Sequence, residues 1–291
     1  MSQERISVST ADVQALITRT RLADVATDTT AAEAERPLFG LSQQNKERLL
    51  SFTSPLLLLV AWELLVQFGL LDKRFFPAPT SIVGTFTNLV TSGELFRHLQ
   101  ASVSRIIIGF LMGAIPALIL GIIMGLSRWI RAFFNPWLAA LYPIPKLAIL
   151  PLVMLIFGLG EMSKYVIIAI AVFFLVIYNT MAGVMNIPSI YLDVGRNFGA
   201  NRVQFWLTVA LPGALPLIFT GIKLAAGVAL LVIVAAEFVG AKTGIGYLIW
   251  QSWQTFSVEA MYVGLVVISV LGFLISTGLD ELEHILIPWR L

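Results

Sequence analysis

Long runs of apolar residues alternate with short polar segments along most of this chain. A helix needs about 20 apolar residues to cross about 30 Å of hydrocarbon, so runs of that length predict membrane-spanning helices. Six segments reach or nearly reach this length. We therefore predict an all-α integral membrane protein with six transmembrane helices. The segments are Ser54–Leu71, Ala101–Leu126, Ala132–Gly158, Lys164–Ile187, Ala214–Val239 and Val258–Leu279.

The polar segments between these runs predict an orientation. Cytoplasmic loops of membrane proteins carry an excess of Lys and Arg. If the N-terminus is cytoplasmic, most basic residues near the span ends lie inside, and the outer segments Asp72–Gln100 and Gly240–Ser257 hold fewer. We therefore expect both termini in the cytoplasm. Trp250 and Trp253 in the second outer segment are typical of a membrane–water interface.

The first 45 residues differ from the rest. They are rich in Thr, Ala, Asp and Glu, and they lack the basic start and apolar core of about 7–15 residues that mark a signal peptide. We expect residues 1–45 to be a weakly ordered cytoplasmic tail and residues 46–291 to form the transmembrane domain. A short helix at Ala11–Val25 would either lie on a surface or belong to a regulatory module.

Composition supports a membrane protein and narrows the chemistry. Hydrophobic residues make up 58% of the chain and charged residues 12%, against about 45–50% and about 25% in soluble domains. The absence of Cys excludes disulfides and thiolate metal sites, and His98 and His284 are too far apart in sequence to suggest a metal centre. The net charge of +2 gives no support for nucleic-acid binding.

Small residues recur at four-residue spacing in the second predicted span. Gly109 and Gly113 form one such pair, and Gly121 and Gly125 form another. This spacing places small residues on one helix face, where another helix can approach closely in lipid. The partner is either a helix of the same chain, which we expect, or a second copy across a dimer seam.

The polar segment Asn186–Gly213 is amphipathic and too polar to span the membrane. Pro188 and Ser189 favour a helix start. Gly199 favours a sharp stop, because glycine tolerates left-handed backbone angles. A second short helix can follow from Asn201 to about Val209. We predict a helix–glycine–helix elbow across the cytoplasmic face.

This loop resembles the cytoplasmic signature of the permeases of binding-protein-dependent ABC importers, E-A-A-x₃-G-x₉-I-x-L-P. The spacing is met in full. Asp193, Val194 and Gly195 fall on E-A-A, Gly199 on G, Val209 on I, and Leu211 and Pro212 on L-P. Val194 and Gly195 depart from Ala-Ala. Gly195 should destabilise the first helix by roughly 0.5–1 kcal/mol relative to alanine.

Other motifs resemble the nitrate/sulfonate/taurine-type subgroup of these permeases, and the similarity covers about Ser54 to Arg290. They are Tyr142-Pro-Ile-Pro-Lys-Leu-Ala148, Phe157-Gly-Leu-Gly-Glu161, Gly244-Ile-Gly-Tyr-Leu-Ile249 and Pro288-Trp-Arg290. The resemblance implies the MetI-like fold of type I importers. It also implies a small oxyanion as solute, such as an alkanesulfonate, taurine, nitrate or bicarbonate, with a pyrimidine-type precursor as the alternative.

The resemblance further implies partners and a location. Residues 187–213 would be a coupling loop seated in an ATP-binding cassette subunit. Two such subunits, a second permease copy and a periplasmic or lipid-anchored solute-binding protein would complete an importer in a bacterial inner membrane. ATP and Mg would be bound by the partner ATPase. The chain has no Gly-x₄-Gly-Lys-Ser/Thr phosphate loop, so we expect no cofactor here and no enzyme activity.

Ionisable residues inside predicted spans are costly and are therefore candidates for function. Lys146 follows the proline-rich stretch Tyr142–Pro145, and broken backbone is tolerated in a membrane only where it faces protein or a cavity. We take Tyr142 and Lys146 as candidate pathway-lining residues, with Lys146 suited to an oxyanion. The alternative is that Lys146 snorkels to the interface or pairs with a carboxylate.

Three further candidates for the pathway are Asn179, Lys223 and Glu237. Each also has a structural interpretation. Asn179 could hydrogen-bond between helices, Lys223 could pair with an acid of the bundle, and Glu237 could stabilise the outer loop that follows it. Glu63 in the first predicted span is expected to form a structural pair.

Two other classes of protein fit the sequence less well. A membrane-embedded enzyme needs clustered His, Cys or acidic residues at membrane depth, and no such cluster is visible. An ion-coupled secondary carrier often has inverted repeats and discontinuous helices. No convincing repeat of two halves is present, and the elbow signature has no role in such a carrier.

Overall fold

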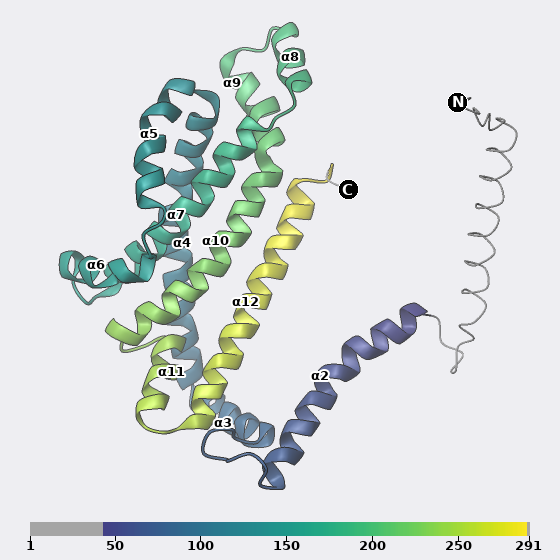
Figure 1. Ribbon diagram of the computed structural model, residues 1–291, viewed down its shortest axis with the longest axis vertical. Coiled ribbons are helices and arrows are strands. Elements are labelled where there is room, and N and C mark those ends of the chain that lie inside the picture. Colours follow the sequence, from purple (N-terminus) through teal and green to yellow (C-terminus); the bar gives the residue numbers. More distant parts are fainter. Residues whose placement is uncertain (1–42, 290–291) are drawn as a thin grey trace, which may run out of the picture. The chain divides into compact units, whose positions relative to one another are not determined.

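The computed structural model describes residues 43–289 and divides the chain into two compact units, Met1–Ala61 and Trp62–Leu291. The described part of the first unit belongs to helix α2 (Gln43–Gln67), which continues into the second unit (Figure 1). The helix predicted at Ala11–Val25 lies outside the described residues.

The described residues form helices and no strand, which confirms the all-α prediction. A one-turn 3₁₀ helix, η1 (Lys146–Ile149), precedes α6, and a π-helical segment, η2 (Trp206–Ala210), joins α9 to α10. The α-helices after α2 are α3 (Pro79–Thr91), α4 (Glu94–Leu126), α5 (Arg128–Leu141), α6 (Leu150–Phe157), α7 (Glu161–Met185), α8 (Ser189–Asn197), α9 (Arg202–Phe205), α10 (Leu211–Gly240), α11 (Ile245–Gln254) and α12 (Val258–Leu286).

Four helical stretches among residues 43–289 are long and apolar enough to cross a membrane: α4, α7, α12 and the continuous stretch Trp206–Gly240. The predicted span Ala132–Gly158 is instead two helical pieces, Arg128–Leu141 and Lys146–Phe157, bent by 84°. Pro143 and Pro145 lie in the break, and proline removes a backbone donor and disfavours helix in the residue before it. In α2 the apolar stretch Thr53–Gln67 is shorter than the others.

The predicted outer loops contain helices that hydropathy did not indicate. The segment Asp72–Gln100 holds α3 and the first turns of α4, and Gly240–Ser257 holds α11. Polar residues such as Glu94 and His98 lower the hydropathy of the first α4 turns without preventing a helix. In α3, Pro79 occupies the first helical position, where its missing N–H costs nothing.

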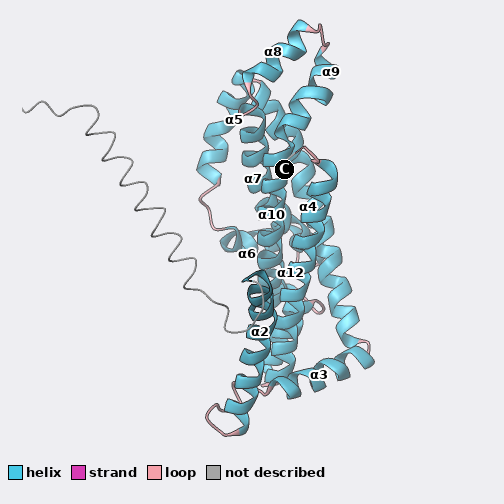
Figure 2. Ribbon diagram, turned by 90° about the vertical axis from the view of Figure 1, so that its right-hand side faces the viewer, coloured by secondary structure: helices cyan, strands magenta, loops and turns pink. Residues whose placement is uncertain are grey.

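The core lies along α7, which packs against both α4 and α10. Buried apolar residues of the three helices, among them Ala117, Ile177 and Ile233, form one cluster. Figures 1 and 2 show α8 and α9 at one end of this unit and α3 and α11 at the other. We call these the elbow end and the α11 end. A second cluster at the α11 end joins α3, α4, α11 and α12.

The glycine stripe of α4 faces α7. A Cβ added at Gly109 would lie 2.7 Å from the Cβ of Ile168, and one at Gly113 would lie 2.3 Å from the carbonyl oxygen of Ala169. Gly121 and Gly125 are equally tight against α7. The small residues therefore serve packing within the chain, as predicted, because a side chain at any of them would push the two helices apart.

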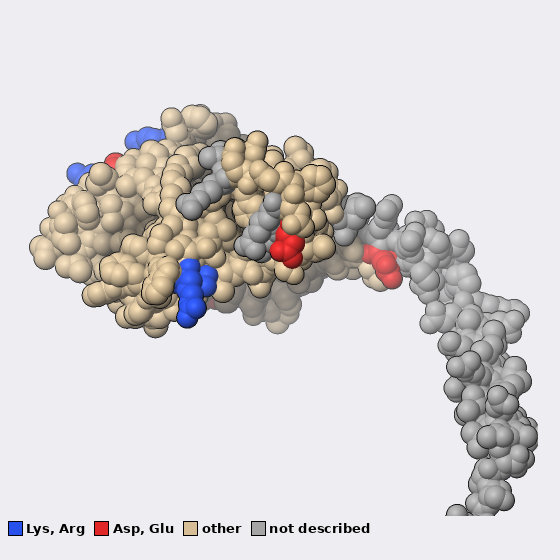
Figure 3. Space-filling view, turned by 90° about the horizontal axis from the view of Figure 1, so that it is seen from above, with Lys and Arg blue, Asp and Glu red and all other residues tan. Residues whose placement is uncertain are grey.

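Large apolar side chains remain exposed along the outside of the bundle. On α4 they recur every four residues, at Ile107, Leu111, Ile115 and Ile119. Such a stripe is too large for a water-facing surface and is typical of lipid contact. Figure 3, which looks onto the elbow end, shows few charged side chains among those that the structure describes there.

Candidate functional site

The predicted elbow is present at residues 189–210, which comprise α8, Gly199, α9 and η2. Gly199 has φ +70°, the left-handed conformation expected at a glycine stop. After it, Asn201 and Gln204 cap each other: each backbone N–H donates to the other's side-chain oxygen, at 3.0 and 2.9 Å. This reciprocal arrangement satisfies two donors at the start of a helix. The second helix does not stop near Val209 but runs through η2 into α10.

Gly195 allows the two elbow helices to pack closely, in addition to lowering the helix propensity of the first. A Cβ at Gly195 would lie 3.0 Å from the Phe205 ring and 3.2 Å from a Val209 methyl. The two positions that fall on the second Ala and the Ile of the signature therefore touch across the elbow. The missing side chain lets α9 and η2 pack directly on α8, which offsets the helix propensity that glycine loses.

The outward face of α8 is apolar. Ile190 and Val194 of α8 and Phe198, the residue directly after it, follow one another at four-residue spacing and are all exposed, Phe198 by 87%. Exposed apolar side chains gathered on one helix face indicate an interaction site. Val194, one of the two departures from the Ala-Ala pattern, therefore adds a larger apolar contact at the elbow surface.

Lys146 bridges the break between α5 and α6. Its ammonium donates to the carbonyl oxygens of Tyr142 at 2.6 Å, Ile144 at 2.9 Å and Leu141 at 3.3 Å. It also lies 4.4 Å from the centre of the Phe174 ring. The last carbonyls of a helix have no partner within the helix, and a cation there satisfies them. Among the described residues it meets carbonyls and no carboxylate.

Tyr142 lies in the same place and is half exposed. Its ring contacts the ring of Tyr178 edge-on, with centroids 5.2 Å apart, and that of Phe174 at 6.2 Å. The break therefore places one cation and three aromatic rings together. Of the five candidate pathway residues, the structure brings Tyr142 and Lys146 together and places the other three elsewhere.

Asn179 and Lys223 lie between helices. Asn179 donates to the Leu175 carbonyl of its own helix at 2.8 Å, and its Cβ lies 2.5 Å from where a Cβ on Gly221 of α10 would be. Lys223 of α10 pairs with Asp280 and Glu283 of α12. The acid partner considered for Lys223 is therefore present on the neighbouring helix.

Glu63 also has polar partners. Its carboxylate accepts hydrogen bonds from the backbone N–H and the hydroxyl of Thr80 at 3.0 and 2.9 Å, and from Gln67 at 2.7 Å. Glu63 thereby ties the end of α2 to the start of α3.

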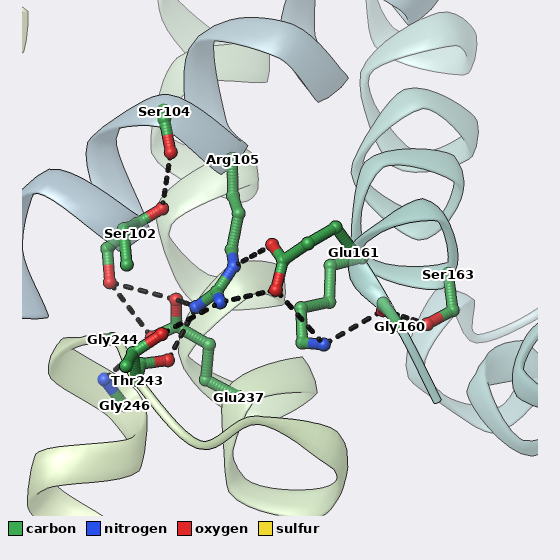
Figure 4. A network of polar contacts seen from close by, with 12 residues as sticks. Ser102, Ser104, Arg105, Gly160, Glu161, Ser163, Glu237, Thr243, Gly244 and Gly246 are labelled. Carbon is green, nitrogen blue, oxygen red and sulfur yellow. Dashed lines mark hydrogen bonds and ion pairs between the residues drawn. The ribbon is translucent and has the colours of Figure 1, made fainter. Parts of the chain in front are cut away.

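Glu237 belongs to a buried polar network at the α11 end (Figure 4). Its side chain is fully buried and accepts hydrogen bonds from the Ser102 hydroxyl at 2.9 Å, from Arg105 at 2.7 Å and from the Gly246 N–H at 2.8 Å. The expected contact with the following loop is thus made. In this structure the carboxylate faces the protein interior.

The network caps the N-terminus of α11 from other helices. Three consecutive backbone N–H groups, of Gly244, Ile245 and Gly246, donate to His98 Nδ1, Ser102 Oγ and Glu237 Oε2 at 3.0, 2.8 and 2.8 Å. The first groups of a helix otherwise lack partners. Gly244 has φ +124°, and a Cβ there would lie 2.2 Å from the Glu237 carboxyl carbon.

This arrangement was not foreseen, although the chain carries a signal for it. His98, Ser102 and Arg105 lie four and three residues apart, on one face of α4. A polar stripe at the start of an apolar span indicates a buried partner. Sequence spacing could not identify that partner, because Glu161, Glu237 and Gly244 lie far along the chain.

A known protein family matches the C-terminal part of the chain. The sequence model of the family described as "Binding-protein-dependent transport system inner membrane component" matches residues 117–288, more than half of the chain. The chain belongs to this family. The matched permease region contains the break at Lys146, the elbow, Glu237 and α11.

Individual relatives agree with the family assignment. This permease is 36% identical to a Bacillus subtilis protein named for aliphatic sulfonates transport, over 81% of this chain and 86% of that one. It is 32% identical to the taurine transport system permease protein of Escherichia coli, over 83% and 90% of the two chains. It is 33% identical to the nitrate import permease protein of Leptolyngbya laminosa, over 68% and 71%.

Solved structures confirm the fold. An inward-facing MetNI methionine ABC transporter matches with a TM-score of 0.57 at 19% identity, over 66% of this chain and 95% of that one. A second crystal form matches with a TM-score of 0.58. The predicted MetI-like importer-permease fold is therefore confirmed. The matches give no support to the pyrimidine or secondary-carrier alternatives.

Proposed function

We propose that this permease is the membrane subunit of an ATP-driven importer for a small oxyanion, and that the elbow is where an ATPase drives it. The observation that carries the proposal is the elbow itself: Gly199 in left-handed conformation, a closed Gly195–Val209 contact and an exposed apolar face on α8. An exposed apolar ridge on a rigid turn is suited to a cleft in a partner protein.

The partners follow from the family and from what the chain lacks. Without a phosphate loop, the chain needs an ATPase to supply energy, and that partner would bind ATP and Mg. Two ATP-binding cassette subunits, a second permease copy and a solute-binding protein, periplasmic or lipid-anchored, would complete the importer. Asp193, Val194, Gly195, Gly199, Val209, Leu211 and Pro212 are the proposed coupling residues.

The elbow end is proposed to be cytoplasmic, with both termini on that side of a bacterial inner membrane. Counted on the sequence, eleven Lys and Arg lie on the elbow side if the N-terminal tail is on that side, Arg128 and Arg131 at the start of α5 among them. Five belong to segments at the α11 end, with Arg105 near that edge: Lys73, Arg74, Arg97, Lys164 and Lys242. Arg131 also donates to the last carbonyls of α4, at 3.2 Å. Basic residues at the cytoplasmic side are the usual arrangement.

An oxyanion is favoured by the charge at the break. Carbonyl oxygens occupy the three N–H donors of Lys146, and the described part of the chain places no carboxylate on it, so it would act on a solute through its uncancelled positive charge. A cation in a low-dielectric setting attracts an anion strongly. The relatives named for sulfonates, taurine and nitrate all refer to small anionic or zwitterionic oxyacids.

The transport cycle would use these parts in order. ATP binding would close the two ATPase subunits and draw the two elbows together. Because the second elbow helix is continuous with α10, the movement would reach the membrane through that helix. The pathway would open toward the binding protein, and hydrolysis would reset it.

The test is whether a cognate ATP-binding cassette subunit docks on this permease, measured by co-purification. Gly199→Val places a β-branched residue at φ +70°, which such residues essentially never adopt, so co-purification should be lost. Gly69→Val is the matched control, because Gly69 has φ +75° and open space around it but lies outside the elbow. Docking that survives Gly199→Val would contradict the coupling assignment.

The solute is tested on the binding protein, because specificity in such systems would reside largely there. Alkanesulfonates, taurine, nitrate, bicarbonate and pyrimidines should be compared by calorimetry under one set of conditions. Binding of an oxyanion alone supports the proposal. Binding of only a neutral or cationic compound would overturn it.

A further inference from the structure

Arg105 has all of its hydrogen-bonding capacity in use. A guanidinium carries five N–H donors in a fixed plane. Two of those of Arg105 go to Glu161, one to Glu237, and two to the carbonyl and hydroxyl oxygens of Thr243. The side chain is almost fully buried. It therefore has no donor left for a solute, and its role is to hold neighbouring segments together (Figure 4).

Those segments come from separate parts of the fold. Glu161 is the first residue of α7, directly after the turn that follows α6. Thr243 lies just before α11, and Glu237 lies in the last turn of α10. Arg105 thus joins three places to α4: the far end of the broken span, the end of α10 and the N-terminus of α11.

The two carboxylates on Arg105 are not equivalent. Glu237 is 0% exposed, and its other donors, Ser102 and Gly246, also belong to the interior. Separating it from Arg105 would leave a buried charge without its counter-ion, which is costly. Glu161 has a side chain that is 51% exposed, so water can replace Arg105 when that contact breaks.

The turn at Glu161 has its own support. Lys164, buried one turn into α7, donates to the carbonyls of Leu159 and Gly160 at 3.3 and 2.9 Å and lies 3.9 Å from Glu161. Gly158 begins the turn with φ +79°. Glu161 lies before Tyr165, where the glycine stripe of α4 begins to contact α7, so the Glu161 side chain can leave Arg105 without separating the two helices.

We propose that Arg105 is a positioning residue for transport: it latches α11 and the start of α7 to α4, and the Arg105–Glu161 contact is the arm that opens when the pathway opens at the α11 end. We call Arg105, Glu161, Glu237 and Thr243 the latch. The inference rests on the proposed function for its role in transport, whereas the latch can be tested without solute or ATPase.

The chain has no Cys, so a single introduced cysteine reports on local opening. Ser252→Cys places a thiol on the buried face of α11, and Thr180→Cys places one in the buried middle of α7 as the reference. Maleimide labelling of the purified protein in nanodiscs is followed for each. Glu161→Gln weakens two of the five contacts that fix the Arg105 guanidinium, and with them its hold on Thr243 just before α11. It should therefore raise the labelling rate at position 252 about tenfold and leave position 180 unchanged.

Matched variants distinguish a local effect of breaking the latch from destabilisation of the whole protein. Glu259→Gln removes an acid at the same end of the molecule but outside the latch, and it should not change labelling. Glu161→Asp keeps the charge on a shorter side chain and should fall between wild type and Glu161→Gln. Equal increases at positions 252 and 180 would mean global destabilisation and would overturn the proposal, as would no increase at 252.

Hydrogen exchange gives the same answer without cysteines. In the wild-type background, the N–H groups of Gly244, Ile245 and Gly246 should exchange at least tenfold faster in Glu161→Gln than in Glu259→Gln. Unchanged exchange there would overturn the latch.

The transport role has its own readout in the assembled importer. Because Glu161→Gln eases opening at the α11 end, it should raise ATP hydrolysis several-fold in the absence of binding protein and lower the solute imported per ATP. A latch seen by labelling and exchange with unchanged hydrolysis would overturn the role in transport. Failure of the ATPase to associate with wild-type permease would instead count against the proposed function.

Discussion

At the residue scale, glycine allows close approaches between helices. A side chain at Gly113 would meet the backbone of Ala169, which cannot rotate out of the way, whereas nothing lies within 4 Å of a Cβ at Gly227. Both residues are inside long helices, so they differ in surroundings rather than in helix propensity. Comparing these two glycines separates the contribution of close packing to stability from the contribution of helix propensity.

We predict that Gly113→Ala lowers the free energy of unfolding by about 1–3 kcal/mol, the usual cost of overpacking. Gly227→Ala should be neutral or stabilising by up to about 1 kcal/mol, because alanine favours helix. Denaturant titration in detergent, followed by tryptophan fluorescence, measures both. Equal effects of the two substitutions would show that α4 and α7 are not packed as tightly as described.

Lys146 is the second residue with a separable role. Lys146→Met removes the charge and the three carbonyl contacts, each of which is a charge-assisted hydrogen bond of about 1.5–3 kcal/mol. Uptake of the oxyanion by the reconstituted importer should fall at least about tenfold. Lys146→Arg keeps the charge and should retain part of the uptake. If Lys146→Met transported normally, Lys146 would not contribute to the pathway.

At the element scale, the elbow depends on how its second helix begins. Asn201→Ala removes the side-chain acceptor for the Gln204 N–H and should cost about 1 kcal/mol. Asn201→Asp keeps an acceptor and serves as the control. Hydrogen exchange over residues 201–205 should be faster in Asn201→Ala and close to wild type in Asn201→Asp. Identical exchange in the two variants would contradict a capping role.

Helices were predictable where a local sequence pattern specifies them. Apolar runs predicted the spans around α4, α7, α10 and α12, and Pro188, Ser189 and Gly199 predicted the first elbow helix with its stop. Helices with mixed surroundings were missed. In α11 the residues Ile245, Leu248 and Ile249 are buried against α3, α4 and α12, and a single sequence does not show which distant segments cover them.

The same limit applies to the candidate site. The elbow is local, so spacing alone located it. The latch is assembled from four segments, and only Glu237 of its members was singled out beforehand. The 84° bend was also beyond the pattern, because prolines indicate a break without giving its angle.

At the scale of the whole molecule, α10 and α12 are joined by Lys223 with Asp280 and Glu283. Lys223→Met would remove the cation that pairs with both acids. We predict a loss of stability of about 1–2 kcal/mol, moderated by the partial exposure of Lys223. Adding Asp280→Asn should recover part of the loss, because it removes one of the two like charges.

Thermal unfolding in detergent at low and high salt measures this effect. The loss of stability caused by Lys223→Met should be smaller at high salt than at low salt, because salt screens the interactions between these charges. A double variant no more stable than Lys223→Met alone would contradict the electrostatic explanation.

The glycine stripe has a consequence for how force crosses the membrane. Gly109 to Gly125 covers sixteen residue steps, about 24 Å of helix at about 1.5 Å per residue, and along it α4 and α7 touch almost backbone to backbone. Two rods joined at so many points cannot slide past each other. We expect them to act as one lever, so that a tilt imposed near the elbow end would be transmitted along them to the α11 end, where Arg105 lies.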